Sequence, residues 1–306
     1  MKDSPYYKQA ELMLKAIPHV AAERNFALKG GTAINLFVRA MPRLSVDIDL
    51  TYLPVDEARE TALRNMSAAL DRIADGIKKS IPGTRVQETH AKNPDRVTRL
   101  TVAMGATRIK IEPNEVIRGA VFPAEDRDLT RRAEDLFELS VAAQTLSLAD
   151  LYAGKLCAAL DRQHPRDLFD VKLLLDHEGL TDEIRKALVV YLASHDRPMH
   201  ELLDPKQKNV RRIFENEFAG MTVDPVSYEE LIAARDTLIE TLRKELTSGE
   251  REFLVSLKAG QTKWSSIGIE GIENLPAVQW KLMNIEKIGA KKQKELLEKL
   301  RRVLGM

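Results

Sequence analysis

The stretch LKGGTAINLFVRAMPRLSVDIDLTYL, residues 28–53, contains the features that decide the fold. An apolar run over residues 26–29 predicts a strand that stops at a Gly-Gly pair. Residues 32–39 then have the apolar spacing of a helix. Residues 46–53 alternate in polarity and are rich in β-branched side chains, which predicts a second strand. A glycine turn therefore joins a strand to a helix, and an acidic strand follows.

Asp47 and Asp49 are the most informative residues of this stretch, because aspartate is depleted in strands. Side chains of a strand alternate between its two faces, so the two carboxylates share one face while the apolar residues between them face a core. Two carboxylates about 7 Å apart repel each other unless a cation lies between them. Mg²⁺ (or Mn²⁺) takes oxygen ligands and is often shared with substrate phosphates, so the pair predicts a metal site. A bare D-x-D is also typical of the solvated face of an edge strand.

The glycine turn has the chemistry of an anion site. Gly30 and Gly31 let the backbone approach a ligand closely, and a helix that starts here offers unpaired N–H groups to a phosphate. Thr32 either caps the helix or donates its hydroxyl to a phosphate. A Gly-Gly-Thr turn alone is more often only a tight turn. Beside an acidic strand it predicts a site for a nucleoside triphosphate with magnesium.

Residues 28–53 resemble the signature of the nucleotidyltransferase superfamily that includes DNA polymerase β. They resemble more closely its AbiEii/AbiGii toxin branch, with the MenT relatives. The turn differs slightly, because Thr32 stands where the family pattern usually has serine. The resemblance implies that Asp47 and Asp49 are catalytic metal ligands and that Gly30, Gly31 and Thr32 bind the nucleotide.

The superfamily commonly uses a third acid on a neighbouring strand. Residues 107–112, TRIKIE, form the second strand of a hairpin that turns at Gly105. The resemblance points to Glu112 as a metal ligand or base. An exposed surface strand is the equally weighted alternative.

A second informative segment is LADLYAGKLCAALDRQHPRDLFDVKLLL, residues 148–175. Lys155 lies among apolar residues, so it needs an anionic partner or a route to solvent. Asp167 and Asp170 are three apart on the next helix and share a face. The toxin family has a similar lysine followed by an Arg-Asp-x-x-Asp helix. That likeness implies that Lys155 contacts the triphosphate and is catalytic with Asp170, and that Asp167 helps to bind the nucleotide. An interlobe salt bridge of Lys155 or Arg166 with Asp167 is the structural alternative.

The remaining patterns predict a mixed α/β half followed by an all-α half. Further strands are expected over residues 85–89 and 97–104, and residues 113–136 read as loop with short elements. After residue 139 only helices are expected, one of them over residues 205–218. We therefore expect an α/β (α+β) fold. We expect an N-terminal nucleotidyltransferase lobe with a mixed sheet over residues 1–145. A C-terminal all-α lobe is expected over residues 146–306, with the active-site cleft between the two lobes.

Composition narrows the class of protein. Of 306 residues, 44% are hydrophobic and 30% are charged, which is ordinary for a globular protein, and the formal net charge of +1 excludes a polybasic nucleic-acid coat. The single cysteine, Cys157, excludes an intramolecular disulfide and fits a reducing, cytoplasmic setting. No apolar run reaches the ~18 residues of a membrane helix, and the N-terminus does not resemble a secretory leader.

The resemblance implies a metal-dependent enzyme that moves a nucleoside monophosphate from a nucleoside triphosphate (NTP) to an acceptor, as a toxin of a bacterial toxin–antitoxin or phage-defence pair. In the MenT relatives the acceptor is the 3′ end of tRNA, and a cognate antitoxin is the implied protein partner. The basic segment over residues 281–306, with eight Lys or Arg and three Glu, is compatible with RNA. Two alternatives remain open. One is a nucleotidyltransferase that modifies a protein or a small molecule, and the other is a nucleotide-binding partner protein without turnover.

Overall fold

The computed structural model describes residues 5–92 and 95–306. By its internal contacts the chain divides into two compact units. The first contains the chain up to Ser147 together with Met221–Asp224, and the second contains Leu148–Gly220 and Pro225–Met306. Each unit has its own arrangement of elements.

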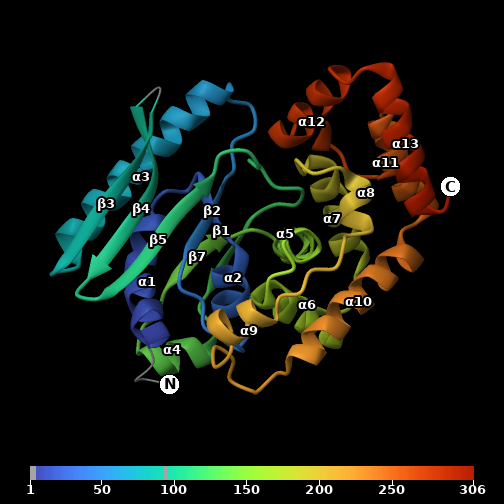
Figure 1. Ribbon diagram of the computed structural model, residues 1–306. Helices are drawn as coiled ribbons and strands as arrows, with labels where there is room; N and C mark the ends of the chain where they lie inside the picture. The colour runs from blue at the N-terminus through green and yellow to red at the C-terminus, as the bar shows by residue number, and fades with distance from the viewer. Residues whose placement is uncertain (1–4, 93–94) are drawn as a thin grey trace. The chain divides into compact units, whose positions relative to one another are not determined.

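Within the described residues, the first unit contains a seven-stranded mixed sheet in the order β3-β4-β5-β2-β1-β7-β6 (Figure 1). The strands are β1 (Phe26–Lys29), β2 (Ile48–Tyr52), β3 (Thr84–Lys92), β4 (Asp95–Met104), β5 (Thr107–Asn114), β6 (Glu125–Asp128) and β7 (Ala142–Thr145). At the centre, β2 pairs antiparallel with β1 and parallel with β5, and β1 pairs parallel with β7. The glycine turn, the acidic strand and the candidate third acid therefore lie on neighbouring strands.

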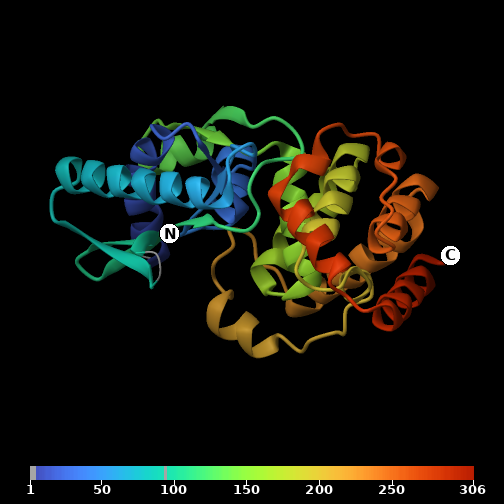
Figure 2. The ribbon, with the colours of Figure 1, turned by 90° about the horizontal axis from the view of Figure 1, so that it is seen from above.

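Two long helices pack on the sheet of the first unit. Helix α1 (Pro5–Ala21) contacts β5 and β7, and α3 (Arg59–Ser80) runs along the β3–β4 hairpin (Figure 2). The buried residues of α3 recur at helical spacing and include Met66, Leu70 and Ile77, which explains why this segment forms a packed helix. A shorter helix, α4 (Arg131–Phe137), lies between β6 and β7 in the sequence.

The segment after the glycine turn differs from an ordinary α-helix. One turn of α-helix, α2 (Gly30–Thr32), continues into a π-helix, η1 (Ala33–Val38). The amide of Arg39 donates to the carbonyl of Ile34, five residues back, which is the π-helical hydrogen bond. Residues 32–39 were thus correctly predicted as helical, but the apolar spacing did not reveal the wider winding.

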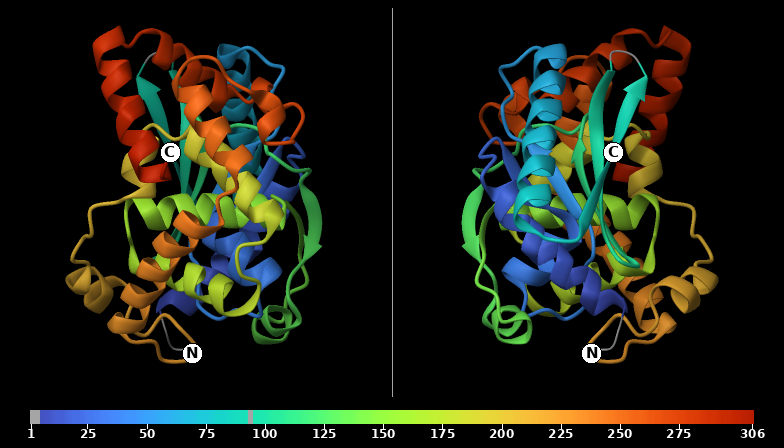
Figure 3. Two further views of the ribbon diagram at one scale, coloured as in Figure 1. Left: turned by 90° about the vertical axis from the view of Figure 1, so that its right-hand side faces the viewer. Right: turned by 90° about the vertical axis from the view of Figure 1, so that its left-hand side faces the viewer.

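The second unit is all-helical in the part of the chain that the structure describes. Its helices are α5 (Leu148–Asp161), α6 (Pro165–His177), α7 (Asp182–Ser194), α8 (Met199–Leu203), α9 (Arg211–Glu217), α10 (Tyr228–Glu245), α11 (Ser248–Lys258), α12 (Pro276–Glu286) and α13 (Ala290–Leu304), with short 3₁₀ turns η2 (Trp264–Ser266) and η3 (Ile272–Asn274). Helix α5 packs against α6 and α7, and α10 packs against α6. Helix α13 lies beside α8 and α11 (Figure 3).

The expected fold class, a mixed α/β part followed by an all-α part, is confirmed, and three local expectations are wrong. The region 113–136 is loop with the short elements β6 and α4, as expected. Strand β2 begins at Ile48, so Asp47 precedes the strand. β-structure continues past residue 139, because β7 pairs with β1 and β6. Residues 205–218 are not one helix, since an extended segment separates α8 from α9. The buried Gln163 side chain holds that segment by bonding the carbonyl of Lys206 and the amide of Lys208.

Across residues 5–92 and 95–306, none of the helices combines the length and the hydropathy that crossing a membrane requires.

Candidate functional site

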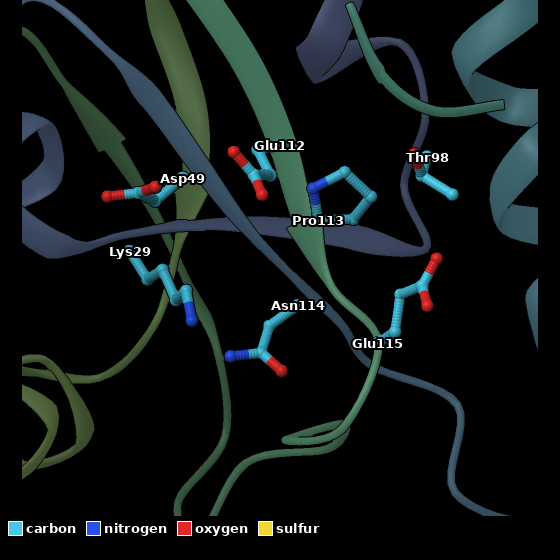
Figure 4. Close-up of a pocket in the computed structure, with 7 residues that line it drawn as sticks. All are labelled: Lys29, Asp49, Thr98, Glu112, Pro113, Asn114 and Glu115. Atoms are coloured by element: carbon cyan, nitrogen blue, oxygen red, sulfur yellow. The ribbon is translucent and has the colours of Figure 1, made fainter. Parts of the chain in front are cut away.

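A cavity of about 450 Å³ lies over the sheet of the first unit, where β1, β2 and β5 run side by side (Figure 4). Its lining residues are Lys29, Asp49, Thr98, Glu112, Pro113, Asn114 and Glu115. The lining is polar and contains three carboxylates. Sequence reasoning singled out two of these residues, Asp49 and Glu112.

Asp49 and Glu112 are direct partners in the parallel pairing of β2 with β5. Adjacent strands are about 4.8 Å apart, so the two side chains leave the sheet next to each other (Figure 4). Both residues are exposed, while Ile48 and Ile111, which precede them, are fully buried. The alternation of the strands thus turns both carboxylates into the cavity. Strand pairing, which the sequence does not show, brings these two acids together.

Asp47 occupies a different position from Asp49. It lies in the segment just before β2, is half-buried, and is not among the residues that line the cavity. Its backbone carbonyl accepts a hydrogen bond from the Thr32 hydroxyl at 2.5 Å. The expectation that Asp47 is a metal ligand stays a prediction.

The backbone conformation and the surroundings of Gly30 explain why a glycine follows β1. Its φ is +68°, which L side chains rarely adopt, and a Cβ built there meets Asp49 Oδ2 at 2.8 Å. The missing side chain therefore leaves room for the Asp49 carboxylate. At Gly31 a Cβ meets Arg43 Nη2 at 2.6 Å, so this glycine makes room for the guanidinium of a residue that is 2% exposed.

Thr32 is buried behind the turn. Its hydroxyl contacts Ser45 Oγ at 3.0 Å in addition to the Asp47 carbonyl. A threonine hydroxyl carries a single proton, and the short bond to Asp47 engages it. Thr32 therefore fixes the segment that leads into β2, and its expected role in phosphate binding stays a prediction.

Lys29 and Asn114 line the cavity and were not singled out from the sequence. Lys29 is the antiparallel partner of Asp49, and Asn114 is two residues after Glu112 on the same strand face. The side-chain carbonyl of Asn114 accepts from the amides of Val116 and Ile117, which fixes the turn after β5. Two features of the sequence could have identified them. Lys29 stands directly before the glycine turn, and Asn114 is two residues after Glu112, so a strand places both on the same face.

Lys155, Asp167 and Asp170 form a buried ion-pair cluster within the second unit. Lys155 Nζ is 3.0 Å from Asp167 Oδ1 and 3.0 Å from Asp170 Oδ2, and both aspartates are at most 1% exposed. Arg162 also bonds both oxygens of Asp167. Although burial raises the pKa of Asp167, the charges of Lys155 and Arg162 hold that pKa well below its usual range. A salt bridge of Lys155 with Asp167 is thus present, but within the second unit and not between lobes as the alternative expected. Contact of these residues with a triphosphate stays a prediction.

The donor set of the cavity fits a hard divalent cation in part. In the described stretches, no three His, Cys, Asp or Glu side chains gather closely enough to hold a metal ion by themselves. Mg²⁺ is nevertheless commonly bound by one or two carboxylates, with water and substrate phosphates completing its shell. Asp49 and Glu112 supply such a pair. Within the described residues, Arg99 is the one cationic side chain at ion-pair distance from Glu112, at 3.8 Å.

Comparison with known proteins places this geometry in a family. Residues 12–283 match the family described as nucleotidyl transferase AbiEii toxin, type IV toxin–antitoxin system. Among solved structures, MenT4, a nucleotidyltransferase toxin from Mycobacterium tuberculosis H37Rv, is similar with a TM-score of 0.61 and 14% identity, over 92% of this chain and 94% of that one. At this identity the likeness shows the fold alone. No curated protein matches the sequence. Since the family match covers most of the chain, from α1 into α12, the chain belongs to the AbiEii family of nucleotidyltransferase toxins of type IV toxin–antitoxin systems.

Proposed function

We propose that this chain is an NTP-dependent nucleotidyltransferase that transfers a nucleoside monophosphate to an RNA acceptor, tRNA in the first instance. In that reaction an acceptor hydroxyl oxygen forms a bond to the α-phosphorus. The bond from the α-phosphorus to the oxygen that bridges to the β-phosphate breaks. Pyrophosphate leaves, and the hydroxyl proton passes to a base or to water. The observation that carries the proposal is the side-by-side placement of Asp49 and Glu112 in one cavity, next to the glycine turn.

The residues of the cavity can bind and orient the triphosphate. The backbone N–H groups at Gly30 and Gly31 begin a helix and suit a phosphate, and the ammonium of Lys29 lies at the same cavity. Asp49 and Glu112, with Asp47 as the third expected ligand, would hold Mg²⁺ or Mn²⁺. Such a cation, when bound, supplies positive charge that offsets the charge of the phosphates. Catalysis of this kind consists mainly of positioning and charge neutralisation.

Labelled triphosphates test this proposal. The purified chain is incubated with each α-³²P-labelled NTP and Mg²⁺, together with tRNA or with a bacterial lysate, and the labelled product is identified. We expect label on tRNA. Asp49→Asn and Glu112→Gln should each lower the rate at least 100-fold. The control Glu88→Gln, which removes an acid from the edge strand β3 of the same sheet, should keep the wild-type rate.

The other outcomes separate the alternatives. Label on protein alone contradicts an RNA acceptor and favours protein modification. Absence of any labelled product, with NTP binding retained, favours a binding protein without turnover. Equal rates for wild type and Asp49→Asn would contradict the assignment of the cavity. Expression in a bacterial host with and without the cognate antitoxin tests the toxin role separately. Growth arrest should occur only without the antitoxin and should depend on Asp49.

A further inference from the structure

Two polar residues lie beyond the carboxylates of the candidate site, on the same face of the sheet. Thr51 and Asn114 are direct partners in the parallel pairing of β2 with β5. They follow Asp49 and Glu112 by two residues, so they share the face of these acids and lie about 7 Å further along the strands. Asn114 lines the cavity (Figure 4). We refer to Thr51 and Asn114 as the polar pair.

The glycine turn lies on the other side of the carboxylates from the polar pair. Strand β1 runs antiparallel to β2, with Lys29 opposite Asp49. Gly30 follows Lys29 and Thr51 follows Asp49, and because the two strands run in opposite directions, these two residues lie on opposite sides of the acids. The order along the sheet face is therefore the glycine turn, the carboxylates and the polar pair.

The side chain of Asn114 can offer a ligand only hydrogen-bond donors. Its oxygen accepts from the backbone amides of Val116 at 2.9 Å and Ile117 at 2.8 Å. Two N–H groups directed at this oxygen fix the orientation of the side-chain amide. Within the described residues, the NH₂ group makes no hydrogen bond. In Figure 4 its nitrogen and the ammonium of Lys29 point toward one another. Both groups are donors, so an oxygen acceptor would fit between them.

Thr51 is a buried polar residue beside this donor. It is 1% exposed, and its hydroxyl has no hydrogen-bond partner in the part of the chain that the structure describes. Buried hydroxyls are nearly always bonded, and an exception needs a cause such as a role at a functional site. The unpartnered hydroxyl and the unpartnered NH₂ group belong to neighbouring strands of one sheet face. One ligand oxygen or phosphate group would satisfy both.

We propose that the polar pair binds the acceptor RNA, at the phosphate group of its terminal nucleotide. This inference rests on the proposed function. In such a transfer the attacking and the leaving oxygen lie in line, on opposite sides of the phosphorus. With the pyrophosphate at the glycine turn and the α-phosphate at the carboxylates, the acceptor hydroxyl approaches from the side of the polar pair. The charged oxygens of a phosphodiester accept hydrogen bonds and donate none, which matches the donors on that side.

Two separate Michaelis constants test this assignment. The KM for tRNA is measured at saturating NTP, and the KM for the NTP at saturating tRNA. Asn114→Asp keeps the oxygen that holds the turn and replaces the donor by a negative charge, so the KM for tRNA should rise about tenfold or more. Thr51→Val removes a hydroxyl that has no partner among the described residues. It should raise that KM about threefold to tenfold without lowering the free energy of unfolding. The KM for the NTP should change less than about twofold in both variants.

Matched controls separate binding from indirect effects. Thr101→Val makes the same substitution on β4, on the same sheet face but outside the cavity lining. Val116→Asp adds a negative charge at an exposed side chain of the turn after β5. Both should keep the wild-type KM values. A tRNA with a methylphosphonate as its last linkage lacks a charged oxygen there, so its KM with the wild-type chain should be higher than that of normal tRNA.

The outcomes distinguish this inference from the proposed function. Unchanged KM for tRNA in Asn114→Asp and Thr51→Val, or a rise in the KM for the NTP instead, would overturn the inference and leave the transfer reaction intact. Equal KM values for normal and modified tRNA would overturn the assignment to a phosphate. If the wild-type chain labels no RNA, the proposed function is wrong, and the inference is wrong with it.

Discussion

At the scale of single residues, Gly30 links the backbone of the turn to the chemistry of the cavity. Its positive φ and the 2.8 Å approach of Asp49 Oδ2 both require the absence of a side chain. A Gly-Gly pair in a sequence indicates only a turn, whereas the structure shows what the missing Cβ makes room for. The same positive φ occurs at Gly83, where a Cβ would meet open space.

Gly30→Ala should therefore abolish nucleotide transfer, because the new methyl group displaces the Asp49 carboxylate. Gly83→Ala imposes a similar backbone strain, on the order of 1–2 kcal/mol, but touches nothing. We expect both variants to lower the free energy of unfolding, measured in urea, and only Gly30→Ala to lose transfer. Normal activity in Gly30→Ala would show that the position of Asp49 at this cavity is not needed.

Thr32 is a residue whose role the sequence left open between capping and phosphate binding. Because its buried hydroxyl bonds the Asp47 carbonyl, Thr32→Val should destabilise the chain by about 1–3 kcal/mol. Thr32→Ser keeps the hydroxyl and should cost less. Urea denaturation of the two variants measures the difference. If Thr32→Val instead keeps full stability while KM for the NTP rises, the hydroxyl acts on the phosphate.

At the scale of elements, the sequence predicted those segments whose own pattern is strong. The strands β1, β4 and β5 have a clear strand pattern, and their positions agree closely with expectation. Strand β7 was missed because its four residues, AAQT, have no strand pattern of their own and are a strand through their pairing with β1 and β6. The wider winding of η1 was missed because the apolar spacing of residues 32–39 does not distinguish a π-helix from an α-helix.

In the candidate site too, the residue types could be predicted from the sequence, and the contacts between strands could not. The acids of β2 and β5 could be chosen from their residue types and strand positions, but their adjacency follows from the parallel pairing of β2 with β5. Lys29 enters the cavity through its pairing with Asp49. Asp167 and Asp170 were chosen as site residues, and their contacts with Lys155 could be expected only as an alternative.

The ion pairs between α5 and α6 make stability depend on pH. Burial raises the pKa of Asp167, but Lys155 and Arg162 lower it further, so the folded pKa lies below the unfolded value. The stabilisation is therefore complete above about pH 4 and is lost as the pH falls through the folded pKa. Asp167→Asn should lower the free energy of unfolding by about 3–5 kcal/mol at pH 7 and by about half as much at pH 2.5, which lies between the unfolded and the folded pKa.

The control for this comparison is Asp176→Asn, which removes a surface partner of Lys172 on the same helix and should cost about 0.5 kcal/mol or less. Urea midpoints between pH 2.5 and pH 7 provide the measurement. A pH-independent difference between wild type and Asp167→Asn would mean that the carboxylate is not held ionised by its partners.

At the scale of the whole molecule, the positive and negative charges nearly cancel, but they are distributed unevenly along the chain. The formal net charge is +1, so no strong overall field draws the chain to nucleic acid. Helix α13 alone has six Lys or Arg and two Glu, and its basic side chains are exposed. An RNA acceptor should therefore be bound through few phosphates, and chiefly at this helix.

The salt dependence of RNA binding measures how many phosphates are neutralised. About four net charges on α13 predict a slope near −3 for the logarithm of affinity against the logarithm of salt concentration, at roughly 0.7 per phosphate of single-stranded RNA. Replacing Lys291, Lys294 and Arg301 by glutamine should reduce the slope by about 2. The same change at the exposed Lys79, Arg85 and Lys110 of the first unit is the matched control and should leave it unaltered. If both triple variants lose the same slope, RNA contacts are spread over both units and α13 has no special part in them. A slope near zero for the wild type would argue for a protein or small-molecule acceptor, because such acceptors do not depend on neutralising a phosphate backbone.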